Sequence, residues 1–394
     1  MSEPKSKSSY LATYLSVLDV DGDGKIDAND FLSLFRSGQK AQPAPPDLKT
    51  RVSDAWGRRN KDLDQLSVTI RDKVSSNRPL ARKSSFSMTD RRMNSILKRL
   101  QLDFSDSNLE DLRTAYIDCL TKAKAVEEEI SDLLAGSSLA SDSEKDEIEK
   151  RLEKAKILLG QLLQRRENLI ADFVDNFSIY NVTISTDQAE VLLSRIDSGD
   201  ITRMTSVFAI VSQLTAQFAE AKEMSGESTN TAQKYYAMYI GLLELQELIQ
   251  SEYIDRMDRS YLPGISNVKR DAERLMAETQ VLMKNMPSEH LRSYEHNLQS
   301  QKFTVEVASI YESALLEDRI RAIQAREIVR NLLRLAENTL KTVKVASDLV
   351  GLMRESQGLY DEVMQLQTPS LVPFENLELK KEFQAVTERL KKSA

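Results

Sequence analysis

Alternating aspartates near the start of the chain form the segment whose chemistry is most specific. Residues 19–30 read Asp-Val-Asp-Gly-Asp-Gly-Lys-Ile-Asp-Ala-Asn-Asp, which places five carboxylates in twelve positions. Hard divalent cations such as Ca²⁺ are held by about six to eight oxygen ligands, and carboxylates are well suited to provide them. Like charges this close together repel one another, so we expect a bound cation to order this segment.

The segment resembles the calcium-binding loop of the EF-hand family, and the resemblance covers about residues 8–38. It implies ligands at loop positions 1, 3, 5, 7, 9 and 12, with Gly24 at position 6 for the sharp turn. The implied ligands are Asp19, Asp21, Asp23, Lys25 through its backbone carbonyl, Asp27 and Asp30. The implied cofactor is Ca²⁺. Mg²⁺ is the alternative ion, because Asp30 is one methylene shorter than the glutamate that usually closes such a loop.

Apolar residues flank the acidic loop at helical spacing. They are Leu11, Tyr14, Leu15 and Leu18 before it, and Phe31, Leu34 and Phe35 after it. Spacings of three and four predict a short amphipathic helix on each side, which an ordinary aspartate- and glycine-rich surface turn would not need. Ile26 occupies position 8, where the family places an apolar residue that pairs with a second loop. EF-hand loops usually work in pairs, but no second loop is evident in the sequence. A second chain could supply the other loop of the pair.

Composition predicts an all-α, cytoplasmic protein with ample length for a core. The 394 residues include 12 glycines and 9 prolines, and 29% of them are charged but only 6% aromatic, as is typical of helical bundles and coiled coils. The sequence contains no apolar run long enough to span a membrane, and its first ten residues lack the apolar core of a secretory signal. The single cysteine, Cys119, excludes an intrachain disulfide.

Positive charge is concentrated in one stretch of an otherwise acidic chain. Residues 49–100 carry 14 basic and 5 acidic groups, although the net charge of the whole chain is −7. The prolines of Gln42-Pro-Ala-Pro-Pro46 cannot continue a helix, so residues 39–104 are interpreted as a Pro-containing basic linker. Two alternatives remain open. The linker lies on the acidic body of its own chain, or it binds an anionic partner, either lipid headgroups or nucleic acid phosphates.

Sustained helical periodicity begins after the basic stretch. Apolar residues recur in alternating steps of three and four over residues 109–133 and again over residues 148–173. Each set forms an apolar seam along one face of a helix, and a short polar segment separates the two seams. Seams of equal length predict an antiparallel helical hairpin over residues 105–180. Folding the chain back in this register brings Arg166 near Tyr116.

The sequence pattern of residues 181–394 predicts a helical bundle whose helices are separated by turn-forming segments. Ser185-Thr-Asp-Gln188 has the form of a capping box at a helix start, and Leu262-Pro-Gly264 is expected to interrupt a helix. Residues 235–257 are apolar on more than one face and should lie inside the bundle. With the loop module at residues 1–38, the expected order is a single EF-hand, a basic linker, a helical hairpin, and a bundle or coiled-coil body.

The sequence shows no arrangement of residues that indicates catalysis, so we expect a protein that is not an enzyme and has no small-molecule substrate. His290 and His296 are six residues apart, which does not suit a zinc-binding pair on one helical face. We expect a Ca²⁺-binding helical interaction or scaffold protein whose metal state alters docking to a protein partner or a second copy of the chain. The alternative is a self-assembling filament or membrane-associated scaffold in which the metal loop is only structural.

Overall fold

A computed structural model gives the fold of much of the chain. It describes residues 46–75, 88–137, 142–224, 229–284, 288–342, 346–367, 369 and 371–393. The chain divides into two units, Met1–Pro45 and Pro46–Ala394, and all the described residues belong to the second. The expected EF-hand module therefore lies outside them. Every regular element among the described residues is helical, so this part of the chain is all-α, as predicted.

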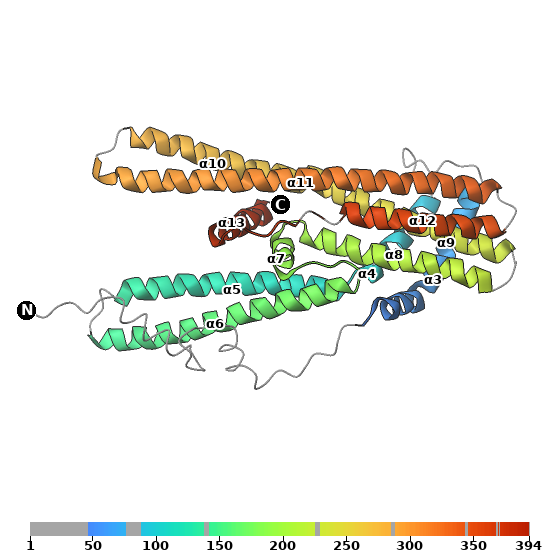
Figure 1. The fold of residues 1–394 in the computed structure, drawn as a ribbon. Helices are drawn as coiled ribbons and strands as arrows, with labels where there is room; N and C mark the ends of the chain where they lie inside the picture. Colours follow the sequence, from blue (N-terminus) through green and yellow to red (C-terminus); the bar gives the residue numbers. More distant parts are fainter. Residues whose placement is uncertain are drawn as a thin grey trace, which may run out of the picture. The chain divides into compact units, whose positions relative to one another are not determined.

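The described residues form α-helices and one π-helical turn. In chain order they are α3 (Leu48–Ser75), α4 (Met88–Phe104), α5 (Ser107–Ser137), α6 (Asp142–Ser178), α7 (Thr186–Ser194), α8 (Ser198–Met224), α9 (Thr229–Arg256), the π-helical turn η1 (Met257–Tyr261), α10 (Leu262–Met283), α11 (Ser288–Thr342), α12 (Ala346–Gln367) and α13 (Leu377–Ser393). Figure 1 shows α5 beside α6 and α10 beside α11 as two long pairs, with α13 between them.

Helices α5 and α6 pair in antiparallel orientation. Near the start of α5, Asn108 Nδ2 donates to Asn176 Oδ1 at 2.7 Å, and near its end Glu129 Oε1 accepts from Arg151 at 3.0 Å. Later residues of α5 thus meet earlier residues of α6. The apolar cluster between the helices contains Cys119, Val126, Ala155, Leu162 and Leu169. The two seams read from the sequence therefore face each other in the structure.

Helix α9 is the central helix of the described unit. Helices α3, α8, α11 and α12 pack around it, and its side chains are buried on every face, as the apolar residues of 235–257 predicted. Helix α3 comes especially close at Gly241, where an added Cβ would lie 2.4 Å from Leu66 Cδ2. Only a residue without a Cβ leaves room for the Leu66 side chain in its present position.

The structure differs from the basic linker expected at residues 39–104. Most of the described part of this range forms helices α3 and α4, whose apolar side chains belong to the same core as the rest of the unit. Leu63, Leu66 and Ile70 of α3 are fully buried. An amphipathic helix keeps its charged residues on the solvent face, so a surplus of charge is compatible with a helix that contributes to the core.

The chain remains helical through Leu262-Pro-Gly264, where an interruption was expected. Helix α9 continues into the π-helical turn η1, and α10 follows directly with Pro263 in its first turn. The Leu262 N–H donates to the Met257 carbonyl in the wider π pattern. Proline lacks an N–H but is tolerated in the first turn of a helix, so no loop is needed here. The expected capping box is present, with both hydrogen bonds between Ser185 and Gln188.

An ion network is buried where α7 leads into α8. Arg195 donates to both carboxylate oxygens of Asp197 at 2.8 Å and to Asp318 of α11 at 2.5 Å. The hydroxyl of Tyr253 on α9 donates to Asp197 at 2.9 Å. The three ionic side chains are almost entirely shielded from solvent. A buried charge is tolerated only when it is paired, so this network fixes the α7–α8 connection to α9 and α11.

Glu337 of α11 is a partly buried carboxyl that should make stability depend on pH. Burial and the nearby Glu244 raise its pKa from 4.5 to about 7, although Lys341 and Lys73 oppose the shift. The folded state therefore holds this proton more tightly than the unfolded chain does. The stabilisation is fully present below the ordinary pKa of about 4.5 and is lost as the pH rises through about 7.

Glu337→Gln should raise the free energy of unfolding by about 1–2 kcal/mol at pH 8 and change it little at pH 5, because glutamine stays neutral at both pH values. Urea denaturation across this pH range measures the difference. Glu295→Gln, on an exposed position of the same helix, is the control and should leave the profile unchanged. An equal gain at pH 5 and pH 8 would contradict the raised pKa.

Candidate functional site

The predicted metal ligands and a groove between helices are the two candidate sites. Asp19, Asp21, Asp23, Lys25, Asp27 and Asp30 all lie outside the described residues, so the ligand set stays a prediction from the sequence. Within the described ranges, no group of three or more histidine, cysteine, aspartate or glutamate side chains is placed to hold a metal ion.

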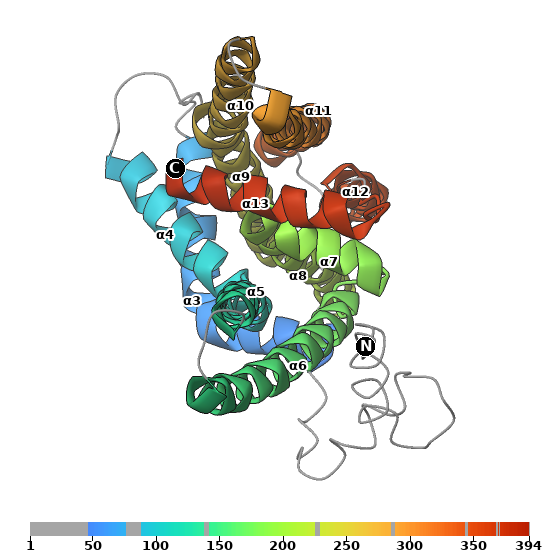
Figure 2. The same ribbon diagram turned by 90° about the vertical axis from the view of Figure 1, so that its left-hand side faces the viewer.

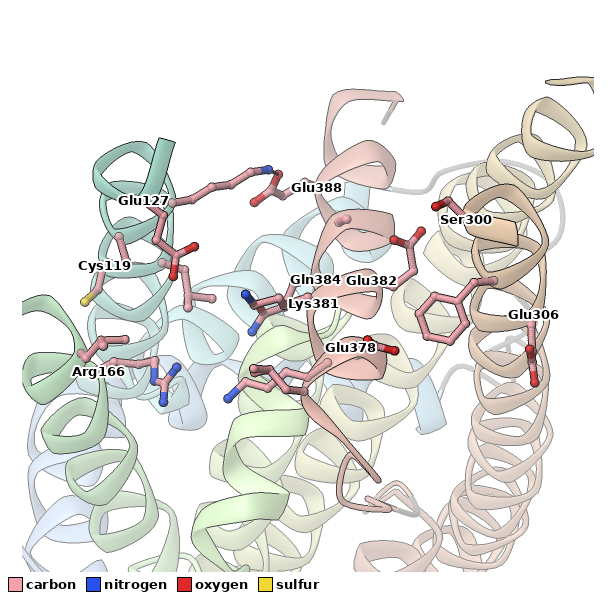
Figure 3. Close-up of a pocket in the computed structure, with 18 of the residues that line it drawn as sticks. Cys119, Glu127, Arg166, Ser300, Glu306, Glu378, Lys381, Glu382, Gln384 and Glu388 are labelled. Carbon is pink, nitrogen blue, oxygen red and sulfur yellow. Dashed lines mark hydrogen bonds and ion pairs between the residues drawn. The ribbon is translucent and has the colours of Figure 1, made fainter. Parts of the chain in front are cut away.

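The groove lies between the α5–α6 hairpin and the first part of α11, and α13 contributes residues along its length. Its volume is about 780 Å³. Figure 3 shows α13 between the two sides, with Cys119 and Arg166 on the hairpin and Ser300 and Glu306 on α11. The apolar side chains that line it include Leu120, Ala123, Leu163, Phe303 and Leu377. Helices far apart in the sequence thus form a single concave surface.

Glu190 of α7 holds two of the cations that line the groove. Its carboxylate lies 2.5 Å from Lys380 Nζ of α13 and 3.8 Å from Arg166 Nε of α6. The hydroxyl of Tyr116 on α5 donates to the same carboxylate at 3.4 Å. Side chains from three other helices therefore converge on one largely buried carboxylate of α7, and this fixes one wall of the groove. The expected proximity of Arg166 to Tyr116 is found here.

Helix α13 is joined to both sides of the groove. Lys124 of α5 forms an ion pair with Glu388 at 3.0 Å, and Thr304 of α11 donates to Glu382 at 2.6 Å. On its buried side, Phe383 stacks on Tyr311 with ring centroids 4.2 Å apart. Stacked aromatic rings stabilise packing beyond the area they bury. The groove is therefore lined by side chains whose positions are set by contacts with neighbouring helices.

The thiol and the phenol beside the groove act as hydrogen-bond donors. Cys119 Sγ donates to the Leu162 carbonyl at 3.1 Å, and burial raises the pKa of the thiol. The reactive form of cysteine is the thiolate, which this environment disfavours. Burial and Glu190 likewise raise the pKa of Tyr116 far above its usual range. Both groups are thus held in their neutral forms at neutral pH.

The cations of residues 49–100 divide into paired and exposed groups. The pairs are Arg51 with Asp106, Arg59 with Asp62 and Asp103, Lys73 with Asp90, and Arg99 with Asp62. Six other cations lie on exposed positions of α3 and α4 and form no ion pair with described residues: Lys49, Arg58, Lys61, Arg91, Arg92 and Lys98. Part of the positive charge is therefore neutralised within the chain, and part faces solvent.

Comparison of the chain with protein-family models, with curated proteins and with solved structures finds no match. Within the part of the chain that the structure describes, no helix has an apolar stretch long enough to cross a membrane.

Proposed function

We propose that this protein is a Ca²⁺-binding helical interaction protein in which the metal state of the N-terminal loop alters docking to a protein partner. The observation that carries the proposal is the alternation of carboxylates at Asp19, Asp21 and Asp23, with Gly24 at the turn and apolar residues at helical spacing on both sides. Ca²⁺ offsets part of this negative charge and orders the loop, and the flanking apolar residues then present a different surface. Mg²⁺ is the alternative ion.

The groove supports the docking part of the proposal. It combines an apolar lining with charged side chains from α5, α6, α11 and α13, a combination that suits an amphipathic helical segment of a partner. Several of these charged side chains already form ion pairs within the chain, so the surface is preorganised and a partner would lose less entropy on binding.

Affinity capture with the full-length protein tests this function. The proposal expects a partner that is retained in Ca²⁺, is released by a chelator, and is not retained by Asp19→Ala. Leu163→Arg should weaken retention because Leu163 lines the groove. Ile157→Arg is the matched control, since Ile157 is exposed on the same helix but does not line the groove. Equal retention in Ca²⁺ and in chelator would contradict the proposal.

The second candidate function is a self-assembling or membrane-associated scaffold in which the EF-hand is only structural. Exposed apolar residues on α11 favour it, since Ile310, Leu316 and Ile320 are 52%, 44% and 54% exposed. Exposed apolar residues on one helix are suited to self-association. Light scattering separates the two functions, because a scaffold should form large assemblies with and without Ca²⁺.

A further inference from the structure

Helices α3 and α4 present their solvent-facing residues on one continuous surface. They are antiparallel neighbours, because Asp62 of α3 pairs with Arg99 late in α4 at 2.6 Å, and Lys73 near the end of α3 pairs with Asp90 early in α4 at 2.9 Å. Figure 2 shows α4 at the left-hand edge of the view, beside α3. Residues on the exposed sides of the two helices are therefore close enough to contact the same partner.

This surface carries positive charge on a chain that is acidic as a whole. Helices α3 and α4 contain eleven basic and six acidic residues, a net charge of +5. Helices α5 and α6 contain ten basic and sixteen acidic residues, a net charge of −6. We call five of the exposed cations the basic face; they are Arg58, Lys61, Arg91, Arg92 and Lys98. An anionic surface would attract the basic face and repel the hairpin.

An exposed leucine lies among these cations. Leu102 is 75% exposed, and steps of seven and four residues place Arg91, Lys98 and Leu102 on the same side of α4. On α3, Val68 is 48% exposed. Cations beside an exposed aliphatic side chain are typical of helices that lie in a membrane interface, where cations contact headgroups and apolar groups enter the acyl boundary.

We propose that the basic face binds the surface of an anionic lipid membrane. Five cations without an acidic partner among the described residues are complementary to anionic headgroups, and Leu102 is positioned to gain apolar contact there. The inference goes beyond the proposed calcium-dependent function and rests only on α3 and α4, so it can fail or succeed independently of the metal site.

The same face is less suited to nucleic acid. Leu102 would gain nothing against a phosphate backbone, and single strands are usually held by aromatic side chains on which bases stack. Trp56 of α3 instead packs edge-on against Phe218, with ring centroids 5.7 Å apart, and Phe104 of α4 is fully buried. Because Trp56 packs on Phe218 and Phe104 is buried, neither ring is free to stack on a base.

Vesicle co-sedimentation with the full-length protein in chelator tests the proposal. The protein should bind vesicles that contain phosphatidylserine and phosphatidylcholine, should not bind phosphatidylcholine alone, and should be released by high salt. The combined variant Arg91→Glu, Arg92→Glu, Lys98→Glu should bind at least about 100-fold more weakly, since each cation near an anionic surface contributes roughly fivefold. Substitution is used because deleting α3 and α4 would remove part of the core.

The matched control makes the same change in net charge elsewhere. Lys122→Glu, Arg274→Glu and Arg334→Glu alter cations that are 61%, 61% and 67% exposed, and together they should weaken binding only about twofold. Leu102→Ser should weaken binding about fivefold, whereas Leu335→Ser, at a position 49% exposed on α11, should not.

Three results would overturn the proposal. They are equal binding to neutral vesicles, equal losses in the basic-face variant and its control, and absence of binding to anionic vesicles. Duplex DNA is the competing ligand. If DNA binds and the basic-face variant loses that binding while vesicles do not bind, the face recognises nucleic acid and the membrane assignment is wrong.

Discussion

Arg195→Met should lower the free energy of unfolding by about 3–5 kcal/mol, which is the range expected when one partner of a buried ion pair is removed. Without the guanidinium, the carboxylates of Asp197 and Asp318 would remain buried as neighbouring like charges. Burial already raises the pKa of Asp318 even with Arg195 present. Urea denaturation at neutral pH measures the loss.

Two further variants make the Arg195 result specific. Asp318→Asn removes one of two carboxylates but leaves Arg195 paired with Asp197, so the loss should stay below about 2 kcal/mol. Arg274→Ala removes an exposed ion pair with Glu278 and should change stability by about 0.5 kcal/mol or less. A loss below about 1 kcal/mol in Arg195→Met would mean that the network does not stabilise the fold as the buried-pair argument requires.

Gly241→Val should destabilise the protein by about 3 kcal/mol, the upper part of the range for overpacking a core. Even a Cβ at this position would lie 2.4 Å from Leu66 Cδ2 and 3.3 Å from Ile70 Cδ1, and valine adds two methyl groups beyond it. Either α3 moves away from α9, or both leucine and isoleucine leave their preferred rotamers. Thermal or urea denaturation gives the change in stability.

Gly57→Val is the matched control for this close approach. Gly57 lies on α3 at an exposed position where an added Cβ meets no atom within 4 Å. Valine has a better helix propensity than glycine, so this variant should be neutral or slightly more stable. If the two variants lost equal stability, the effect would come from the residue type and not from the α3–α9 contact.

The parts of the fold that the sequence predicted are those with local, uninterrupted patterns. Steps of three and four over residues 109–133 and 148–173 predicted which faces of α5 and α6 meet, and the structure places these seams in one apolar cluster. The Ser185 capping box was equally clear, because both of its hydrogen bonds join residues three apart. In each case the determining interactions lie within one helix or between neighbours in the chain.

Helices α3 and α4 were missed because charge was weighed above apolar spacing. Leu63, Leu66 and Ile70 follow helical steps, but 14 basic residues in the surrounding stretch suggested a solvated linker. The burial of Arg195 and Asp197 was also not predicted, because charged residues in a turn are typical of an exposed surface connection. Their burial depends on Asp318, which is far away in the sequence, so no local pattern could reveal it.

The groove could not be predicted from local sequence patterns for the same reason. Its lining comes from four helices that the chain visits at widely separated points. One signal was present, because Arg166 interrupts an otherwise apolar seam, and a charge in such a position needs a partner. The sequence placed Tyr116 nearby, but Glu190 and Lys380 could be assigned to the same site only once α7 and α13 were located.

Calorimetric titration of Ca²⁺ into the full-length protein tests whether the N-terminal loop binds this ion. We predict one bound ion per chain, loss of binding in Asp19→Ala because the first loop ligand is removed, and unchanged binding in Asp54→Ala, which removes an exposed carboxylate of α3. Mg²⁺ titrated in parallel gives the ion preference that Asp30 leaves open. Ca²⁺ affinity that is the same in Asp19→Ala and in the unmodified protein would contradict calcium binding by this loop.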